Sequence, residues 1–321
     1  MPDVTVVSAV YKLSLGVRNV KVRIISAAVG IVVLAGVLLI PNPIALVIAC
    51  AAAAALAVYE LLNNTGLMKQ KSLLGISMGF AAAEVLVCYY VNWFSALVPA
   101  SYAVLALIVQ YLPVILLVAY VLCLVVHIVI PTVHVTLESG EYAFLLTLYA
   151  TAGFGCIALL RAFRNVGLWL VLLLMVIAWM SDTGAYFVGT FLGKHKMAPK
   201  LSPKKSWEGF FGGWLISVAA AVGLFFLRLH WLSGENLFGA LILYILVALV
   251  LAPLSVVGDL LASFIKRKTG IKDYGNIMPG HGGVMDRFDS VMFIAPLLYL
   301  VAVNYSVIYN AFVDLIRWIG L

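Results

Sequence analysis

Long apolar runs recur along the chain and are separated by short polar segments. About 20 helical residues cross the roughly 30 Å hydrocarbon core of a bilayer, and runs of this length recur from residue 24 to residue 312. The pattern predicts membrane-spanning helices over residues 23–40, 43–62, 73–91, 142–160, 167–189, 210–228, 238–258 and 290–312, with one or two more within 95–131. We therefore expect an all-α polytopic membrane protein without a separate soluble domain.

The composition agrees with this pattern. Hydrophobic residues make up 65% of the 321 residues and charged residues only 10%, which no soluble domain can accommodate. The first 23 residues show no small-residue cleavage site before a full-length span, so we expect no cleaved signal peptide. The four cysteines stand alone inside apolar runs, which favours neither a zinc site nor a disulfide framework.

The charge pattern predicts the orientation in the membrane. On a membrane protein, a net charge of +7 indicates orientation rather than nucleic-acid binding. The basic loops 193–208 and 263–289 are separated by two spans, so both lie on one side, which the positive-inside rule makes the cytoplasm. A total of about nine helices also places the N-terminal arm and the loop 63–72 inside, whereas ten would place them outside. We expect nine, although Arg161 and Arg164 then face outward.

With nine helices, residues 95–131 hold one span plus an interfacial or re-entrant piece, broken near Pro113. We divide the chain into an N-terminal arm (1–22), N-terminal transmembrane helices (23–165) and a C-terminal catalytic region (166–321). Small residues spaced four apart allow close helix contact in lipid. They occur at Gly75/Gly79, Gly189/Gly193 and Gly209/Gly213.

The segment GDLLASFIKR, residues 258–267, places Asp259, Ser263 and Lys266 on one helical face. Asp259 stands where apolar sequence gives way to polar sequence. A carboxylate at that depth is costly unless it is paired or metal-bound, so it is a functional candidate. An ordinary ion pair between Asp259 and Lys266 is the alternative.

The next motif is PGHGG, residues 279–283, followed at once by DRFD. Glycines around a histidine leave backbone N–H groups bare, and successive N–H groups form an anion-binding nest. Asp286 and Asp289 are three residues apart and share a helical face, whereas Arg287 points elsewhere. Two acids on one face repel each other unless something positive lies between them, and Mg²⁺ is the obvious candidate. An ordinary interfacial turn is the alternative.

A second loop, KLSPKKSWEGFFGG at 200–213, carries Lys204 and Lys205 next to Ser206. It is not a Walker loop, because its glycines follow the lysines. A helix N-terminus near Ser206 could receive a phosphate, although Gly209 at the third position rules out a capping box and we expect no cap. A stop-transfer basic loop is the alternative.

Upstream, Asp182 lies in an apolar span with no cation within a helical turn, so its partner must be a metal or come from another helix. Acids for a metal, cations for phosphate and a glycine nest together favour phosphoryl or nucleotidyl transfer. Their place at the membrane surface suggests that one reactant is a lipid.

The two motifs S-x-x-K-R-x4-K-D-x-G and P-x-H-G-G-x-x-D-R-x-D together resemble the signature of the phosphatidate cytidylyltransferases (CDP-diacylglycerol synthases). The matching residues are Ser263, Lys266, Arg267, Lys272, Asp273, Gly275, Pro279, His281, Gly282, Gly283, Asp286, Arg287 and Asp289. SPKKSWEG, the Asp of SDTGAY, RIISAAVG and the Tyr59-Glu60-Leu61 tripeptide are also similar to family elements. Met278 departs from the usual Leu, Ile or Phe. The resemblance covers roughly residues 165–312.

The resemblance implies an enzyme that transfers a cytidylyl group from CTP to phosphatidic acid, giving CDP-diacylglycerol and pyrophosphate. It implies Mg²⁺ held by Asp259 and Asp286, and it allows a second cation such as K⁺ and a homodimer. It implies a multi-pass protein of the plasma (inner) membrane, whose two basic loops form an active site facing the cytoplasm. The expected catalytic residues are Lys266, Arg267, Lys272, Asp273, His281, Arg287 and Asp289, and the expected substrate-binding residues are Lys204, Lys205, Ser206, Ser263, Gly282, Gly283 and Asp182.

Other functions fit parts of the pattern. A CDP-archaeol synthase or a polyprenol kinase would share the loops and differ in the lipid or in the group transferred. An anion transporter is of a different class, but transporters tend to place paired broken helices at the midplane. Here the charge gathers at one face of the membrane.

Overall fold

The computed structural model describes residues 25–95, 102–129, 135–229, 237–280 and 282–308. The described chain is almost entirely helical, with one short β-hairpin. Its elements are the helix Ile25–Leu39, α2 (Ile44–Tyr59), the π-helical turn η1 (Glu60–Asn64), α3 (Lys71–Ser95), α4 (Ala103–Gln110), α5 (Leu112–Val129), α6 (Leu137–Ala162), α7 (Gly167–Leu192), β1 (Lys196–Ala198), β2 (Ser202–Ser206), α8 (Trp207–Arg228), α9 (Leu237–Lys268) and α10 (Met285–Val303).

Seven of the described helices are long and apolar enough to cross a membrane: α2 with η1, α3, α5, α6, α7, α8 and α9. This confirms a helical multi-pass membrane protein. The predicted spans 23–40 and 290–312 correspond to the shorter helix Ile25–Leu39 and to α10, which begins with a charged turn. The total of nine therefore stays a prediction.

The segment 95–131 contains the short α4 and one long helix, α5, as expected for one span plus a short piece. The two helices meet at Tyr111 rather than at Pro113. Proline at the second position of α5 is tolerated, because the first turn of a helix makes no use of its backbone N–H groups.

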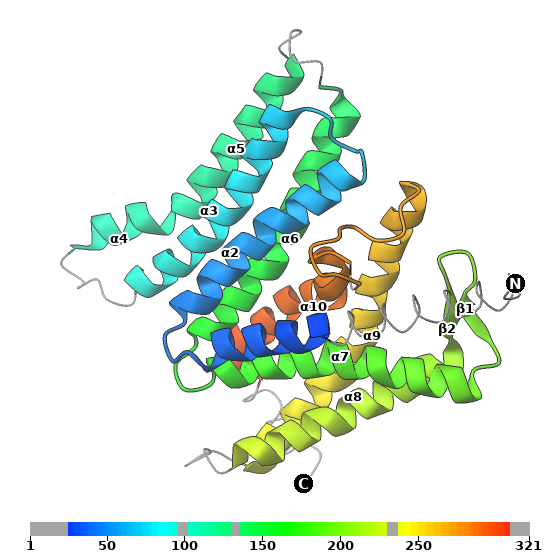
Figure 1. The fold of residues 1–321 in the computed structure, drawn as a ribbon. Coiled ribbons are helices and arrows are strands. Elements are labelled where there is room, and N and C mark those ends of the chain that lie inside the picture. The colour runs from blue at the N-terminus through cyan, green and yellow to red at the C-terminus, as the bar shows by residue number, and fades with distance from the viewer. Residues whose placement is uncertain (1–24, 96–101, 130–134, 230–236, 281, 309–321) are drawn as a thin grey trace, which may run out of the picture.

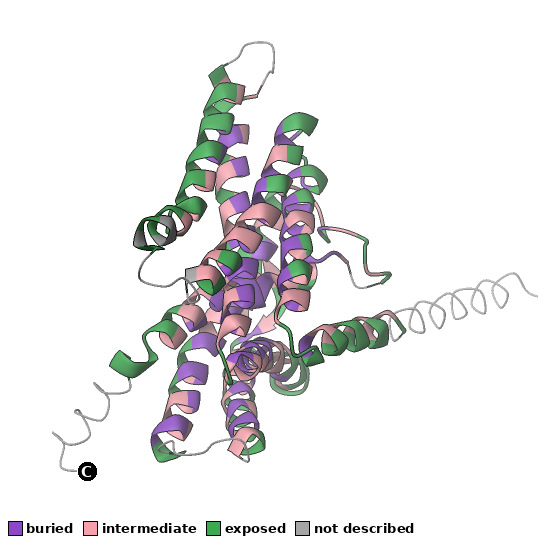
Figure 2. Ribbon diagram, turned by 90° about the vertical axis from the view of Figure 1, so that its left-hand side faces the viewer, coloured by how far each residue is buried: buried purple, intermediate pink, exposed green. Residues whose placement is uncertain are grey.

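The helices form two groups that meet at α10. Figure 1 shows α2, α3, α5 and α6 running alongside one another, with α7 and α8 side by side across one end. α10 packs against α6, α7 and α9, and so joins the groups. Residues that face the centre are buried and outer faces are exposed (Figure 2). In a bilayer these apolar outer faces are covered by lipid chains, so their exposure needs no other explanation.

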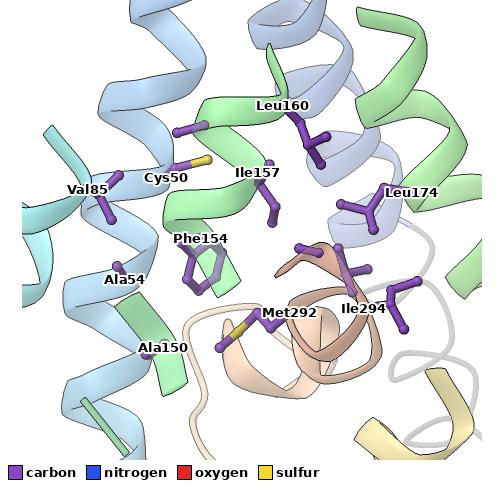
Figure 3. Packing of buried hydrophobic residues seen from close by; sticks show 14 of the residues in the cluster. Cys50, Ala54, Val85, Ala150, Phe154, Ile157, Leu160, Leu174, Met292 and Ile294 are labelled. Atoms are coloured by element: carbon purple, nitrogen blue, oxygen red, sulfur yellow. The ribbon is translucent and has the colours of Figure 1, made fainter. Parts of the chain in front are cut away.

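The core forms where α2, α3, α6, α7 and α10 meet. Phe154 and Ile157 of α6 lie among Val85, Leu174 and Met292 (Figure 3). Small residues allow these five helices to approach closely in places. A Cβ added to Gly153 of α6 would lie 2.7 Å from Cβ of Met292.

Glycines also bring α7 and α8 together, as two of the predicted pairs require. A Cβ on Gly209 would lie 2.7 Å from the Ala185 carbonyl oxygen, and one on Gly213 would collide with the Ser181 carbonyl. The packing role of Gly189/Gly193 and Gly209/Gly213 is thus confirmed. The pair Gly75/Gly79 makes no such contact, since added Cβ atoms there would meet nothing within 4 Å.

The hairpin of β1 and β2 links α7 to α8 and was not predicted. Its antiparallel strands pair Lys196 with Ser206. The expectation of no cap at α8 is wrong, because the Ser206 hydroxyl accepts a hydrogen bond from Gly209 N at 3.2 Å. A lone serine can cap a helix without the acidic partner that a capping box needs. Lys205 directly precedes this cap, so it lies at the N-terminal end of α8.

Candidate functional site

A polar pocket of about 210 Å³ lies between α7, α8, α9 and the hairpin. Its charged walls are Asp182 from α7, Lys204 and Lys205 from the hairpin, and Asp259 from α9. The two lysines belong to the predicted basic loop 193–208, whereas Asp182 lies in a span and Asp259 lies on α9 just before the second basic loop, 263–289. The two loops do touch beside the pocket, where Arg267 Nε donates to the Leu201 carbonyl at 3.4 Å. That both loops form one active site stays a prediction.

Lys205 and Asp259 form an ion pair inside this pocket, with 2.5 Å between Nζ and Oδ2. The alternative pair of Asp259 with Lys266 does not form among the described residues, where Lys266 binds Asp286 instead. Lys205 Nζ is buried and has no hydrogen bond of good geometry within the described chain. An ammonium group carries three donors, so Lys205 retains donors for an anionic ligand.

Asp182 finds its partner on another helix, as predicted. The Ser290 hydroxyl of α10 donates to Asp182 Oδ2 at 3.3 Å. The carboxylates of Asp182, Asp259 and Asp289 also lie close enough for their charges to interact. Lys205 acts on Asp182 and Asp259. Lys266 acts on Asp289. A bound cation would stabilise these three acids further, because like charges at short range in a membrane protein repel strongly.

Asp286 is held much more tightly than Asp259. Its Oδ1 accepts from Lys266 Nζ at 3.0 Å, and its Oδ2 accepts from the backbone N–H groups of Tyr274 at 2.8 Å and Gly283 at 3.0 Å. Lys266 is also within electrostatic range of Asp289. The positive group expected between Asp286 and Asp289 is therefore present in the protein as the Lys266 ammonium.

The signature loop, residues 269–284, is anchored by a residue that the site prediction missed. Glu60 of η1 is fully buried and accepts from Val284 N at 3.0 Å and Met285 N at 2.8 Å. It thereby caps the N-terminus of α10, where the helix dipole favours a negative charge. Gly275 and Gly283 pack against the same carboxylate, leaving no room for a Cβ. Two signals were available: a glutamate inside an apolar run, and the similarity of the Tyr59-Glu60-Leu61 tripeptide to a family element.

The glycine nest is thus used at least partly inside the protein. Gly280 and Gly282 have φ angles of +75° and +89°, which glycine adopts without strain. The three N–H groups that follow, at residues 283–285, donate to the carboxylates of Asp286 and Glu60. The anions that these N–H groups bind are therefore carboxylates of the protein itself.

Tyr274 closes the inner side of the signature loop. Its side chain is fully buried, its hydroxyl donates to the Ala262 carbonyl at 2.9 Å, and Lys266 Nζ lies 5.2 Å from the ring centroid. Burial, followed by the nearby charges of Asp289 and Asp286, raises the pKa of the hydroxyl well above its usual value. The group therefore stays protonated and donates.

The other predicted site residues fall into three sets. Ser206, Ser263, Gly283 and Asp289 are buried. The exposed charged residues of the predicted site are Lys204, Arg267, Lys272, Asp273 and Arg287. His281 lies outside the described residues, and its neighbour Gly282 packs against the Asp286 carboxylate.

The fold and the site define a multi-pass membrane protein with an acid-and-lysine pocket at one end of its helices. Residues 21–305 match the model of the cytidylyltransferase family. This chain therefore belongs to that family.

Several curated relatives carry the name phosphatidate cytidylyltransferase. One from Staphylococcus epidermidis is 42% identical over 165 residues, which are 51% of this chain and 60% of the relative. Those of Staphylococcus haemolyticus and Staphylococcus aureus are 41% and 38% identical, with the same shares covered. The matched segment thus spans less than two thirds of each relative's own length.

Proposed function

We propose that the chain transfers a cytidylyl group from CTP to phosphatidic acid, giving CDP-diacylglycerol and pyrophosphate. The observation that carries this proposal is the pocket in which the buried Lys205 ammonium meets Asp182 and Asp259. Lys205 offers donors to a triphosphate, and the carboxylates offer ligands to a divalent cation. The surrounding apolar helices supply the bilayer setting that a lipid substrate requires. The names of the matched relatives support the same reaction.

In the proposed reaction, an oxygen of the lipid phosphate attacks the α-phosphorus of CTP in line. The new P–O bond forms as the bond to the β-phosphate breaks, and pyrophosphate leaves. A phosphate monoester is already a nucleophile, so no strong general base is required. Lys204 and Lys205 would bind the triphosphate, and Lys266, Arg267 and Arg287 would neutralise charge on it and on the headgroup.

The remaining predicted residues have supporting roles in this proposal. His281, Gly282 and Gly283 would position a phosphate, and Ser206 and Ser263 would support the walls. Lys272 and Asp273 would shape the entrance, where both are exposed. Asp289 would orient neighbouring cations or bind a second one such as K⁺.

The donor set fits Mg²⁺. Asp182 and Asp259 border one pocket, and Mg²⁺ is commonly bound through one or two carboxylates plus substrate phosphates. Within the described part of the chain, no three His, Cys, Asp or Glu side chains could enclose an ion by themselves. Asp259 stays the first proposed ligand and Asp286 the second, through the oxygen that now accepts from Lys266. When bound, the ion would neutralise charge developing on the phosphates.

The orientation is also part of the proposal. The Ser26 hydroxyl donates to the Pro279 carbonyl at 2.9 Å, so the first described helix begins beside the signature loop. Two points on one side of a membrane are separated by an even number of spans, and a total of nine helices places eight spans between these two points. The contact therefore supports nine helices, with the loops on the cytoplasmic side of a plasma membrane. A homodimer and the division at residue 165 remain predictions.

The direct test uses the purified full chain in detergent with Mg²⁺, phosphatidic acid and each of the four nucleotides in turn. We expect CTP-dependent labelling of the lipid from α-labelled CTP and none from γ-labelled CTP. Labelling from the γ position would identify a lipid kinase. Activity with an archaeal ether-lipid phosphate alone would identify a CDP-archaeol synthase. No turnover with any lipid phosphate would overturn the proposal.

A further inference from the structure

A second cavity, apolar and of about 680 Å³, lies beside the signature loop. It shares no lining residue with the acid-and-lysine pocket. One wall is the helix Ile25–Leu39, with Val29 and Val33, and a second is α2, with Ala49 and Ala53. Phe154 and Ile157 of α6 contribute from the core side, where Figure 3 shows them. Its volume is in the range of about 300–1,000 Å³ typical of ligand sites.

The walls offer few partners to a polar ligand. No charged side chain of the described residues lines the cavity, and the one hydroxyl, that of Ser26, already donates to the Pro279 carbonyl. Burying a polar group without a hydrogen bond is costly. We therefore expect the part of the occupant inside the cavity to be apolar.

The cavity ends against the residues that carry the proposed chemistry. Met278, Pro279 and Val284 line it, and so does Phe288 of α10. The next residue, Asp289, lies within electrostatic range of Asp259 and Asp182. One turn of α10 thus presents an aromatic ring to the apolar cavity and a carboxylate to the polar site.

The opposite side of the cavity is accessible from the bilayer. Ile25, Val29 and Val33 line it, yet these three residues are 63%, 57% and 60% exposed. In a membrane, the molecules at that surface are lipids, whose chains are as apolar as the cavity. A chain entering there would carry its headgroup toward the signature loop.

We propose that this cavity binds one acyl chain of the lipid substrate and so aligns the headgroup phosphate with the signature loop. This inference rests on the proposed function, because it takes the substrate to be a diacyl lipid phosphate. When an acyl chain moves from lipid into an apolar cavity, no apolar surface is removed from water. The cavity therefore contributes positioning rather than large affinity. The expected consequence is a dependence of kcat/KM on chain length.

The first experiment fills the cavity. In Ala53→Phe, and independently in Val33→Trp on the exposed wall, we expect kcat/KM for dioleoyl phosphatidate to fall by roughly tenfold, since the positioning contact is lost. The value of kcat/KM for dihexanoyl phosphatidate should change by less than about twofold, because a short chain makes little use of the cavity. Ile48→Phe is the matched control, since Ile48 is exposed on α2 and does not line the cavity.

The second experiment locates the chain directly. Wild-type protein is irradiated with a phosphatidate that carries a diazirine near the end of one chain, and the adducts are mapped by mass spectrometry. Adducts on the helix Ile25–Leu39 and α2, reduced by Ala53→Phe, would support the proposal. Adducts only elsewhere, in protein that turns over phosphatidate, would overturn it. Equal labelling by a phosphatidylcholine probe would also overturn the proposal, because the cavity would then hold any lipid chain. A crosslinker attached at Val33 that reacted with residues 1–24 would overturn it too, because the occupant would then be the protein's own N-terminal segment.

The two proposals fail in different ways. If wild-type protein has no activity with either chain length, the proposed function fails, whatever the adducts show. If activity is present and the filled variants treat both chain lengths alike, only the acyl-chain site fails.

Discussion

Two acidic centres lie close together in this molecule, and they are bonded very differently. Around Asp286 and Glu60, every carboxylate oxygen accepts at least one hydrogen bond, and four of the five donors are backbone N–H groups. Around Asp182 and Asp259, the described partners are one serine hydroxyl and one lysine. The difference suggests a division of labour. The first centre mainly fixes the loop, although the Asp286 oxygen that accepts from Lys266 is also the proposed second metal ligand. The second centre keeps carboxylate oxygens available for a ligand.

The largest effect should come from Asp259→Asn. Removal of one charge at nearly constant shape should lower CTP-dependent activity by about 10³-fold, as loss of a charge-stabilising group in an active site does. The melting temperature should fall less than in Asp286→Asn, because loss of the ion pair with Lys205 is partly offset by relief of the repulsion from Asp182 and Asp289. Turnover and thermal unfolding in detergent measure the two effects.

Asp286→Asn is the matched comparison. Its amide must turn a donor either toward the backbone N–H groups of Tyr274 and Gly283 or toward the Lys266 ammonium, so activity and melting temperature should both fall. If folded Asp259→Asn retained near-normal activity, the assignment of Asp259 to the metal would be wrong. If Asp286→Asn were as stable as wild type, the division between the two centres would fail.

Next in size is Lys205→Met. The buried ammonium pairs with Asp259 and retains donors, so its loss should lower kcat/KM for CTP by roughly a hundredfold. Lys204→Met is the control from the adjacent position, where the side chain is exposed. There we expect a loss of less than about tenfold, because exposed charges are screened by water and salt. Similar losses in both variants would show that general basicity of the hairpin, not the pocket, is what matters.

Glu60→Gln tests the anchoring of the loop. A glutamine cannot accept both N–H groups of Val284 and Met285 without turning its own donor toward one of them, which should cost about 1–3 kcal/mol. Activity should fall by about tenfold through displacement of the loop. Thermal unfolding and KM for Mg²⁺ measure the two consequences, since a displaced loop should weaken the response to the ion.

Glu84→Gln, on α3, is the control for Glu60→Gln, because it replaces another glutamate of a predicted span. Glu84 Oε2 is buried without a hydrogen-bond partner among the described residues, and Oε1 accepts only from Cys88 Sγ at 3.6 Å. A charge in a span is costly, so neutralising this side chain should leave stability equal or slightly higher. A loss as large as that of Glu60→Gln would contradict the anchoring role.

The comparison also shows what the sequence can and cannot predict. Spacing along one helix placed Asp259, Ser263 and Lys266 on one face of α9, and apolar length found the spans. Both are local properties of a helix. The pairing of Asp259 with Lys205, and of Lys266 with Asp286, depends on how helices approach each other, so the neighbouring residue on the same face was the wrong partner to expect.

Glu60 shows the same limit at longer range. It contacts residues 224 and 225 positions further along the chain, and no local pattern encodes such a contact. The hairpin was missed for a different reason. Its strands, Lys196–Ala198 and Ser202–Ser206, are short and polar, so neither alternation nor β-branched residues mark them.

The smallest effect concerns Tyr274→Phe. Phenylalanine keeps the ring beneath Lys266 and removes only the hydrogen bond to the Ala262 carbonyl, so we expect a loss of about 1 kcal/mol in stability. Activity should change by less than about threefold, because the loop stays anchored through Asp286 and Glu60.

The pH dependence of that loss tests why the hydroxyl is buried. Because burial raises the pKa of Tyr274 above its ordinary value of 10.0, the folded state holds the proton after the unfolded state has released it. The stability that the hydroxyl contributes is therefore complete below about pH 10 and declines as the pH rises further. The difference in unfolding free energy between wild type and Tyr274→Phe should shrink between about pH 9 and pH 11. The other tyrosines are common to both proteins and cancel in this difference. A difference that grew with pH would mean that the loop stabilises the ionised hydroxyl, which its neighbours Asp286 and Asp289 make unfavourable.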